Sequence, residues 1–242
     1  MESVVLGGVT LTSSYVVEGV VRPLPTPVPS YEAVAGSDRN VILDVRFEPP
    51  TISFTIIATD KTASQRRTMA RDLAAILLSK QPVTLSFSGD GGKYYRGVVS
   101  DELEMREFVR CGLLPVSFLC DSAAMYGTTR TVTVPSGGTA SVTVGGTYPT
   151  RPSVVCESAV RNSSSLVWGL KLDDQKFVHV MTGSSSSRRV EFDCEARVCK
   201  VSNSLTLPTL DSDWLELTPG SHTLKNDQGS GSCVVTFTER HL

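Results

Sequence analysis

The second half of this chain consists of short runs of alternating apolar and polar residues, separated by closely spaced turn residues. From Val132 onward, turn signals recur at Gly137-Gly138, at Gly145-Gly146, at Asp173-Asp174 and in the serine-rich stretch 183–187. Regular short strands with turns at this spacing predict two packed β-sheets, as in a sandwich or jelly roll. This half shows no helical spacing, so we expect it to be all β.

The segment 193–242 predicts how that domain closes. Trp214, Leu215 and Leu217 alternate with polar residues, and Pro219-Gly220 follows as a strong turn signal. Val234 and its neighbours up to Phe237 then form a last apolar run. We expect a closing pair of antiparallel strands here.

The first half mixes strands with one helix. Its clearest strand is Thr51–Ala58, with Ile52, Phe54 and Ile56 on one face. Further strand patterns occupy Val41–Glu48, Val83–Phe87, Lys93–Val99 and Val109–Leu119, with a turn at Ser88–Gly92. We therefore expect a β-rich domain with one helix.

The helix is predicted over Thr62–Ser79. Thr62 and Gln65 have the spacing of a capping box, and Gln81-Pro82 ends the pattern. The apolar stripe that should pack on a sheet contains Met69, Leu73, Ile76 and Leu77. We expect the basic residues on or near the other side, at Arg66, Arg67 and Arg71.

A proline-rich segment, Arg22–Ser30, interrupts the first half. Its four prolines fix φ and remove backbone donors, so the segment cannot lie inside a sheet. Two interpretations remain, a surface loop or an extended arm that reaches a neighbouring subunit.

Charge and targeting signals exclude several classes. The net charge is −2, and neither half has the basic excess of a nucleic-acid binder. No positive leader with an apolar core and no membrane-length apolar run is present, so we expect a protein made and kept in the cytoplasm until release. The six cysteines lie mostly in strand patterns and are expected to be buried free thiols, without a zinc site.

No motif for catalysis emerges. The histidines His179, His222 and His241 lack metal-ligand spacing, and Ser88–Lys93 lacks the spacing of a phosphate loop. A serine–histidine–aspartate triad stays open, because its members need not be close in sequence. We expect no enzyme, no metal and no cofactor.

Several short motifs follow one another in a fixed order. They are Val34–Asp38, Ser117–Gly127, Gly145–Pro152, Val190–Cys194 and Leu217–Gly220. Their order and spacing over most of the chain resemble the siphophage distal tail proteins, a phage tail component family. In Ser117–Gly127, Ser122-Ala123 stands where that family has a proline step.

The resemblance implies a mainly β fold. Residues 1–128 would form a tail-tube-like β-sandwich with one α-helix, and residues 129–242 a galectin-like or carbohydrate-module-like jelly-roll β-sandwich. Six copies would form a ring that connects the tail tube to the baseplate or tail-tip hub and lets DNA pass without sequence-specific binding. The partners would be further copies of the chain, the tail tube protein, the tail-tip hub protein and receptor-binding proteins. The location would be the virion tail tip, after assembly in the bacterial host cytoplasm.

Such a ring suggests roles for particular residues. Candidate subunit contacts are Arg22, Pro23, Pro25, Pro27, Pro29, Met69 and Leu73. Acids that line a bore repel DNA phosphates, and the candidates are Asp101, Glu102, Glu104 and Glu107.

Two other functions stay open. One is a carbohydrate-binding adhesion module of a virion, in which Trp168 and Trp214 stack on sugar rings if they are exposed. The alternative to sugar binding is that both tryptophans pack in a hydrophobic core. The other function is hydrolysis, which requires an acid pair or a triad in a cleft.

Overall fold

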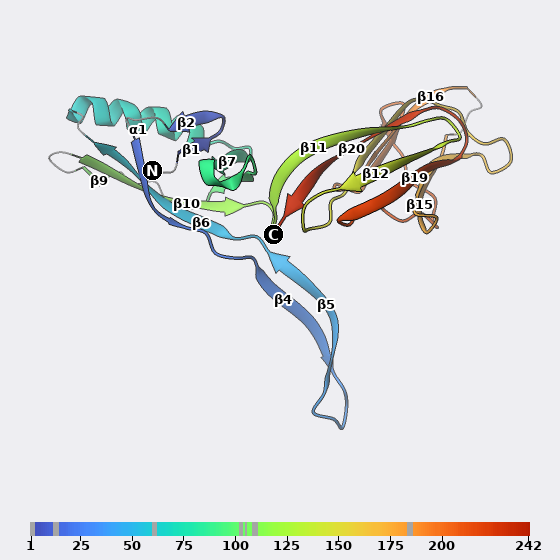
Figure 1. Cartoon of the computed structure of the whole chain (residues 1–242), viewed down its shortest axis with the longest axis horizontal. Helices are drawn as coiled ribbons and strands as arrows, with labels where there is room; N and C mark the ends of the chain where they lie inside the picture. Colours follow the sequence, from blue (N-terminus) through green and yellow to red (C-terminus); the bar gives the residue numbers. More distant parts are fainter. Residues whose placement is uncertain are drawn as a thin grey trace. The chain divides into compact units, whose positions relative to one another are not determined.

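The chain forms two compact units, residues 1–126 with Leu242 and residues 127–241. The computed structural model describes residues 3–11, 15–59, 62–101, 104, 106–107, 111–182 and 186–242, with Thr59 and Glu107 described by their backbone alone. Figure 1 shows the elements of both units. Those of the first unit are β1 (Val4–Leu6), β2 (Val9–Leu11), β3 (Tyr15–Val21), β4 (Thr26–Ala33), β5 (Asn40–Glu48), β6 (Thr51–Thr59), α1 (Ala63–Leu77), β7 (Val83–Phe87), β8 (Tyr95–Val99), β9 (Arg106–Glu107) and β10 (Cys111–Cys120).

One strongly curled sheet makes the body of the first unit. Its strands run in the order β2-β1-β7-β8-β10-β6-β3, with β9 added to β10. The two end strands are close in sequence, because β2 ends at Leu11 and β3 begins at Tyr15. Four peptide steps span at most about 15 Å, whereas a flat sheet of this many strands is about 29 Å wide. The sheet must therefore fold back on itself and enclose its apolar face.

That enclosed face holds the core of the first unit. Ile52, Phe54 and Ile56 of β6 are buried, as their alternation predicts. On β10, Leu114, Val116 and Phe118 are buried while the residues between them are not. The predicted mainly β fold is confirmed here, with the two layers formed by the two halves of one curled sheet.

Helix α1 begins where the sequence predicts. Thr62 accepts a hydrogen bond from the backbone N–H of Gln65, and the Gln65 side chain bonds back to the Thr62 backbone. Leu73 and Leu77 are buried. The prediction for Arg66 was wrong, because this residue is also buried. Arg66 lies seven residues before Leu73 and therefore shares its helical face.

The second unit is a two-sheet jelly roll. Strands β11 (Met125–Val134), β20 (Cys233–His241), β13 (Ser153–Ala159), β16 (Arg188–Asp193), β17 (Val198–Val201) and β18 (Ser204–Leu205) form one sheet in that order. Strands β12 (Thr139–Val144), β19 (Gly220–Gln228), β14 (Val167–Leu172) and β15 (Lys176–Met181) form the other. The described residues of this unit contain no helix.

The core between these sheets is rich in large side chains. Trp168 is fully buried and stacks on Phe192, with ring centroids 6.2 Å apart. Four of the six cysteines of the chain lie in this core, and all six are free thiols. Burial raises the pKa of the Cys194, Cys199 and Cys233 thiols to about 12, so they stay protonated and inert near neutral pH.

Two predictions about segment 193–242 were wrong. Strands β19 and β20 are consecutive but do not pair, because each joins a different sheet. Residues 214–217 alternate in burial but form no strand, and Leu217 makes only an isolated bridge to Thr150. Alternation indicates one buried face, whereas strand pairing depends on which backbone lies alongside.

The turn at Pro219-Gly220 is held by His222. Its Nδ1 lies 2.6 Å from Oδ2 of Asp173, and its Nε2 lies 2.7 Å from the carbonyl oxygen of Thr218. A neutral imidazole has one N–H, so only the protonated ring donates to both acceptors. Burial alone lowers the pKa of His222, but the hydrogen bonds to Asp173 and Thr218 outweigh it and raise this pKa.

Neither a metal site nor a membrane span is found in the part of the chain that the structure describes. No group of three or more histidine, cysteine, aspartate or glutamate side chains there is arranged to hold a metal ion. Among the same residues, no helix is long and apolar enough to cross a membrane.

Replacing a core leucine tests the packing of the second unit. Leu170 is fully buried, so Leu170→Ala should lower the free energy of unfolding by about 2–5 kcal/mol. Leu210 is fully exposed, so Leu210→Ala should change it by no more than about 0.5 kcal/mol. Urea unfolding followed by tryptophan fluorescence measures this unit alone, since Trp168 and Trp214 both belong to it. Equal losses in both variants would contradict the described core.

The His222 contacts predict a pH-dependent stability. The pKa of His222 is higher in the folded state than its unfolded value of 6.5, so protonation of this side chain stabilises the folded state. The stabilisation is fully present below pH 6.5 and is lost as the pH rises through the folded pKa. The pKa of Asp173 is lowered from 3.8, because bonds from His222 and Thr223 outweigh its burial, so this carboxylate stays ionised at pH 5.5. We expect His222→Gln to destabilise the second unit more at about pH 5.5 than at about pH 9. Urea unfolding at both values tests this, and equal differences would refute it.

Candidate assembly surfaces

The proline-rich segment belongs to a long two-stranded arm. Within the described part of the chain, strands β4 and β5 pair only with each other, over Thr26–Ala33 and Asn40–Glu48 (Figure 1). Pro27 and Pro29 fit because both strands of a two-stranded ribbon are edges. The sequence predicts an arm or a loop for Arg22–Ser30 but does not show that Val41–Glu48 is its second strand. The alternation of Val41–Glu48 matches that of a core strand, yet β5 is exposed along nearly its whole length.

The two faces of the arm differ in chemistry. Residues two apart on a strand share a face, and residues opposite each other in the register share it too. A register shift between Ser30 and Tyr31 places Tyr31 opposite Ile42. We call one side the apolar arm face, and it contains Pro27, Pro29, Tyr31, Ala33, Ile42, Val45 and Phe47, together with Asn40 opposite Ala33. The charged arm face contains Thr26, Ser30, Glu32, Asp44, Arg46 and Glu48, together with Val28 and Val41.

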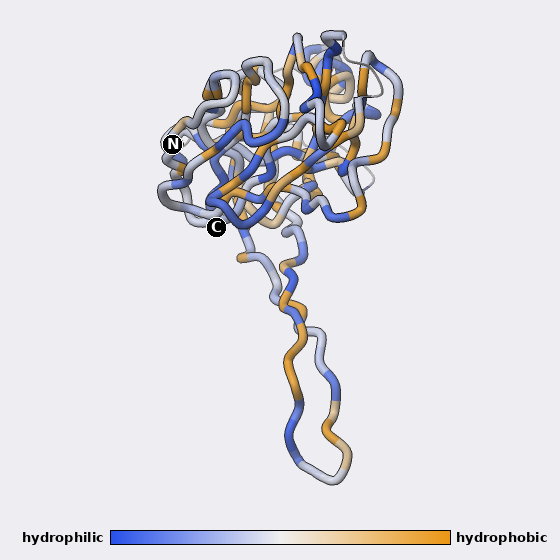
Figure 2. Tube along the Cα trace, turned by 90° about the vertical axis from the view of Figure 1, so that its right-hand side faces the viewer, coloured by the Kyte–Doolittle hydropathy of each residue, from blue (hydrophilic) through white to orange (hydrophobic). Residues whose placement is uncertain are grey.

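The apolar arm face lies open to solvent. Tyr31 is 59% exposed, Ile42 66% and Val45 44%. Figure 2 shows hydrophobic segments along the arm, which has no core of its own. An isolated two-stranded hairpin is marginally stable in water. The side chains gathered on this face are therefore suited to packing against another surface.

The root of the arm is attached to the curled sheet by Arg22. Its Nη1 lies 2.7 Å from Oδ1 of Asp90, in the 3₁₀ turn Ser88–Asp90 that follows β7. The guanidinium also lies 4.0 Å from the centroid of the Phe87 ring. Asp90 was not among the predicted site residues, since nothing in its local sequence marks it as a partner of Arg22. Arg22 therefore orients the arm from within its own chain.

The other predicted contact residues differ in exposure. Pro23, Pro27 and Pro29 are exposed, and Pro25 is half-buried. Met69 on α1 is half-buried and faces partly outward. Leu73 is 2% exposed inside the core of its own unit, so its side chain is not available to a neighbouring subunit.

The acidic candidates lie on the connection from β8 to β10. Asp101 and Glu104 are exposed. Glu107 pairs with Gly112 through its backbone in β9. Glu102 lies outside the described residues. Among the described residues, no basic side chain forms an ion pair with Asp101 or Glu104.

The two tryptophans have different environments. Trp168 is fully buried and is not available to stack on a sugar. Trp214 is half-buried, packs against the core of the second unit and lines two surface hollows. Its exposure depends on the connection from β18 to β19, which the sequence pattern does not reveal.

Comparison with known families gives two matches along the chain. Residues 9–120 match the family model described as phage tail protein RIFT-related domain. Residues 145–241 match the model described as siphovirus-type tail component, C-terminal domain. Comparison with curated protein sequences found no match.

Solved structures with a similar fold come from phage tails. The crystal structure of phage SPP1 Dit (gp 19.1), titled a paradigm of the hub adsorption apparatus in phages that infect Gram-positive bacteria, has a TM-score of 0.75 at 21% identity, and the match covers all of both chains. A chain of the phage p2 baseplate in its activated conformation with Sr has a TM-score of 0.53 at 10% identity over 97% of each chain. Both family models and the shared fold lead to one assignment. This chain belongs to the siphophage distal tail protein family, whose members are structural components of phage tails.

Proposed function

We propose that this chain assembles through its arm into a six-membered ring, which joins the phage tail tube to the tail-tip hub and leaves a passage for DNA. The observation that carries this proposal is the apolar arm face, which the first unit itself does not cover. Family membership supports a tail location, and the similar SPP1 protein is described as part of a hub adsorption apparatus.

Burial of the apolar arm face supplies the driving force for assembly. Removing a large apolar side chain from water contributes about 1.5–3 kcal/mol. Tyr31, Ile42 and Val45 together therefore contribute several kcal/mol if a neighbouring copy covers them. The prolines of β4 limit the freedom of the unbound arm, which reduces the entropy lost on docking.

The geometry of the arm suits a cyclic assembly. An arm that docks on a different surface of the next copy makes a heterologous contact, and repetition of this contact closes a ring if the rotation permits. The contact of Arg22 with Asp90 and Phe87 fixes the direction in which the arm leaves the sheet. A fixed direction favours the same rotation at every interface.

The remaining assignments follow from this ring. Asp101, Glu102, Glu104 and Glu107 line the passage in our proposal, where negative charge keeps DNA phosphates from adhering. The ring acts as a structural adaptor and not as an enzyme. Its neighbours are the tail tube protein, the hub protein and receptor-binding proteins, in a virion assembled in the host cytoplasm.

Substitutions on the two arm faces test this proposal. The double variant Ile42→Asp with Val45→Asp places charges on the apolar arm face and should weaken assembly more than 100-fold, because the burial of two apolar side chains is lost. The matched double variant Asp44→Asn with Arg46→Gln, on the charged arm face, should assemble like the parent chain. Light scattering and negative-stain images of the purified chain should show six-fold rings for the parent and monomers for the first variant. Rings formed by the Asp variant would exclude the arm as the contact, and a parent chain that stays monomeric would exclude assembly from this chain alone.

A further inference from the structure

A small hollow with charged walls lies on the surface of the second unit, and we call it the charged hollow. It has a volume of about 360 Å³ and is lined by Arg151, Lys176, Arg197, Ser212, Asp213, Trp214 and Glu216. This volume falls within the range of about 300–1,000 Å³ that is usual for small-ligand sites. Every lining side chain except Trp214 is polar or charged. Such walls suit a hydroxyl-rich ligand, because polar groups need new partners when a ligand displaces water.

The backbone that carries Trp214 is held in place on both sides. The N–H of Asp213 donates to the carbonyl oxygen of Phe177 in β15, at 2.8 Å. Leu215 is fully buried, and Trp214 itself packs against the core of the unit. A ring that is already held in position loses little freedom when a ligand binds. Less of the binding free energy is therefore lost to ordering the site.

Arg197 occupies a backbone position that favours glycine. It ends the turn from β16 to β17 with a φ of 54°, in the left-handed region that most side chains disfavour. Asp193 holds this turn, because its Oδ1 accepts hydrogen bonds from the N–H groups of Glu195 at 3.1 Å and Ala196 at 2.9 Å. The arginine side chain is thus accommodated at a cost in backbone strain. Strain of this kind occurs preferentially at functional sites.

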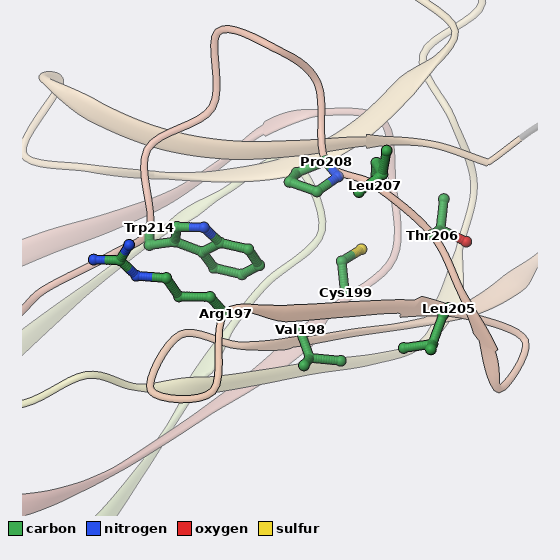
Figure 3. A pocket seen from close by; sticks show the side chains of 8 residues that line it. All are labelled: Arg197, Val198, Cys199, Leu205, Thr206, Leu207, Pro208 and Trp214. Atoms are coloured by element: carbon green, nitrogen blue, oxygen red, sulfur yellow. The ribbon is translucent and has the colours of Figure 1, made fainter.

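Trp214 and Arg197 lie next to each other. Both also line a second, more apolar hollow of about 480 Å³, and Figure 3 shows them at one end of it, with Leu205 and Leu207 at the other. Trp214 is half-buried, so part of its ring packs against the core and part is accessible. An accessible aromatic ring with a guanidinium beside it can stack on one part of a ligand and bond to another.

The charged hollow has an excess of positive charge. Three cations and two acids line it, so its net charge is +1. Arg151 is paired with Glu216, with 3.1 Å between Nη2 and Oε2. In the described part of the chain, no ion pair is found for Lys176 or Arg197. These two cations therefore complement an acidic group on a ligand.

We propose that the charged hollow binds a sugar ring that carries an acidic group, either a carboxylate or a phosphate. The C–H groups of the sugar ring lie on the negative face of Trp214. The acidic group bonds to Arg197 and Lys176, while Asp213 accepts hydrogen bonds from the hydroxyls. A peptide anchored by an apolar side chain fits less well, because the walls offer that side chain no apolar contact besides Trp214. The site requires only the second unit and does not depend on the proposed ring.

Matched sugars test the class of ligand. Glucose and galactose are each compared with their uronate and their 6-phosphate by saturation-transfer NMR with the full chain. We expect at least one acidic sugar to bind about 10-fold more tightly than its neutral parent, because it adds a charge-assisted hydrogen bond. The uronates and the phosphates show which acidic group the site takes. Equal affinities of acidic and neutral forms, or no binding by any of them, overturn the proposal.

Substitutions locate the binding site, with affinities measured by isothermal titration calorimetry. Arg197→Gln should weaken the acidic sugar about 10-fold, because the guanidinium is lost. Arg188→Gln removes a positive charge at the other end of β16 and should leave the affinity unchanged. Trp214→Leu keeps an apolar side chain against the core but removes the aromatic face, so binding should be lost. Unchanged affinity in Arg197→Gln refutes the site.

Arg197→Gly separates a role in binding from a role in folding. Glycine adopts a φ of 54° without strain, so the thermal unfolding midpoint should stay the same or rise. The affinity for the acidic sugar should fall as it does in Arg197→Gln, since both variants lack the guanidinium. A midpoint that falls together with the affinity would show that Arg197 supports the fold, and would overturn its assignment to the ligand.

Discussion

Unpaired sheet edges are the physical constraint on which this structure depends. A chain built almost entirely from strands must pair or cover the backbone groups at each edge. The first unit achieves this largely by curling, which returns β3 to the neighbourhood of β2. The second unit covers the β15 edge with the segment after β18, since Thr209 donates to the carbonyl oxygen of His179 and Asp213 to that of Phe177. Apolar side chains stay exposed on the arm, where the proposed assembly would cover them.

The arm shows how an exposed ribbon is held in position. Its own two strands supply few buried contacts, so its orientation comes from the root, where Arg22 bonds Asp90 and lies over Phe87. Asp90 is only 12% exposed, and an ion pair partly shielded from water is stronger than one at the surface. The prolines of β4 have no backbone N–H and so make that edge a poor template for unintended pairing. The arm can therefore present an apolar face while its other edges discourage aggregation.

The segment after β18 passes from one sheet to the other, because Thr206 donates to Cys199 of β17 and Thr209 donates to His179 of β15. The hairpin from β17 turns at Ser202 and Asn203, which have positive φ values of 49° and 66°, as two-residue hairpin turns require. Pro208, which has no N–H, then bridges Val180 of β15. Trp214 belongs to the same connection and lines two surface hollows.

Local patterns in the sequence determined much of this fold. The alternation of Ile52, Phe54 and Ile56 predicted a buried strand, the capping box at Thr62 predicted the start of the helix, and closely spaced turns predicted the jelly roll, because each depends on residues that are neighbours in the chain. The tertiary structure alone decided that Val41–Glu48 leaves the core as an arm, that Asp90 holds Arg22, and that β19 and β20 join opposite sheets. It also decided that Trp168 is buried while Trp214 borders the surface. Periodicity records that one face of a segment is apolar, whereas the partner that covers this face is set by contacts between residues far apart in sequence.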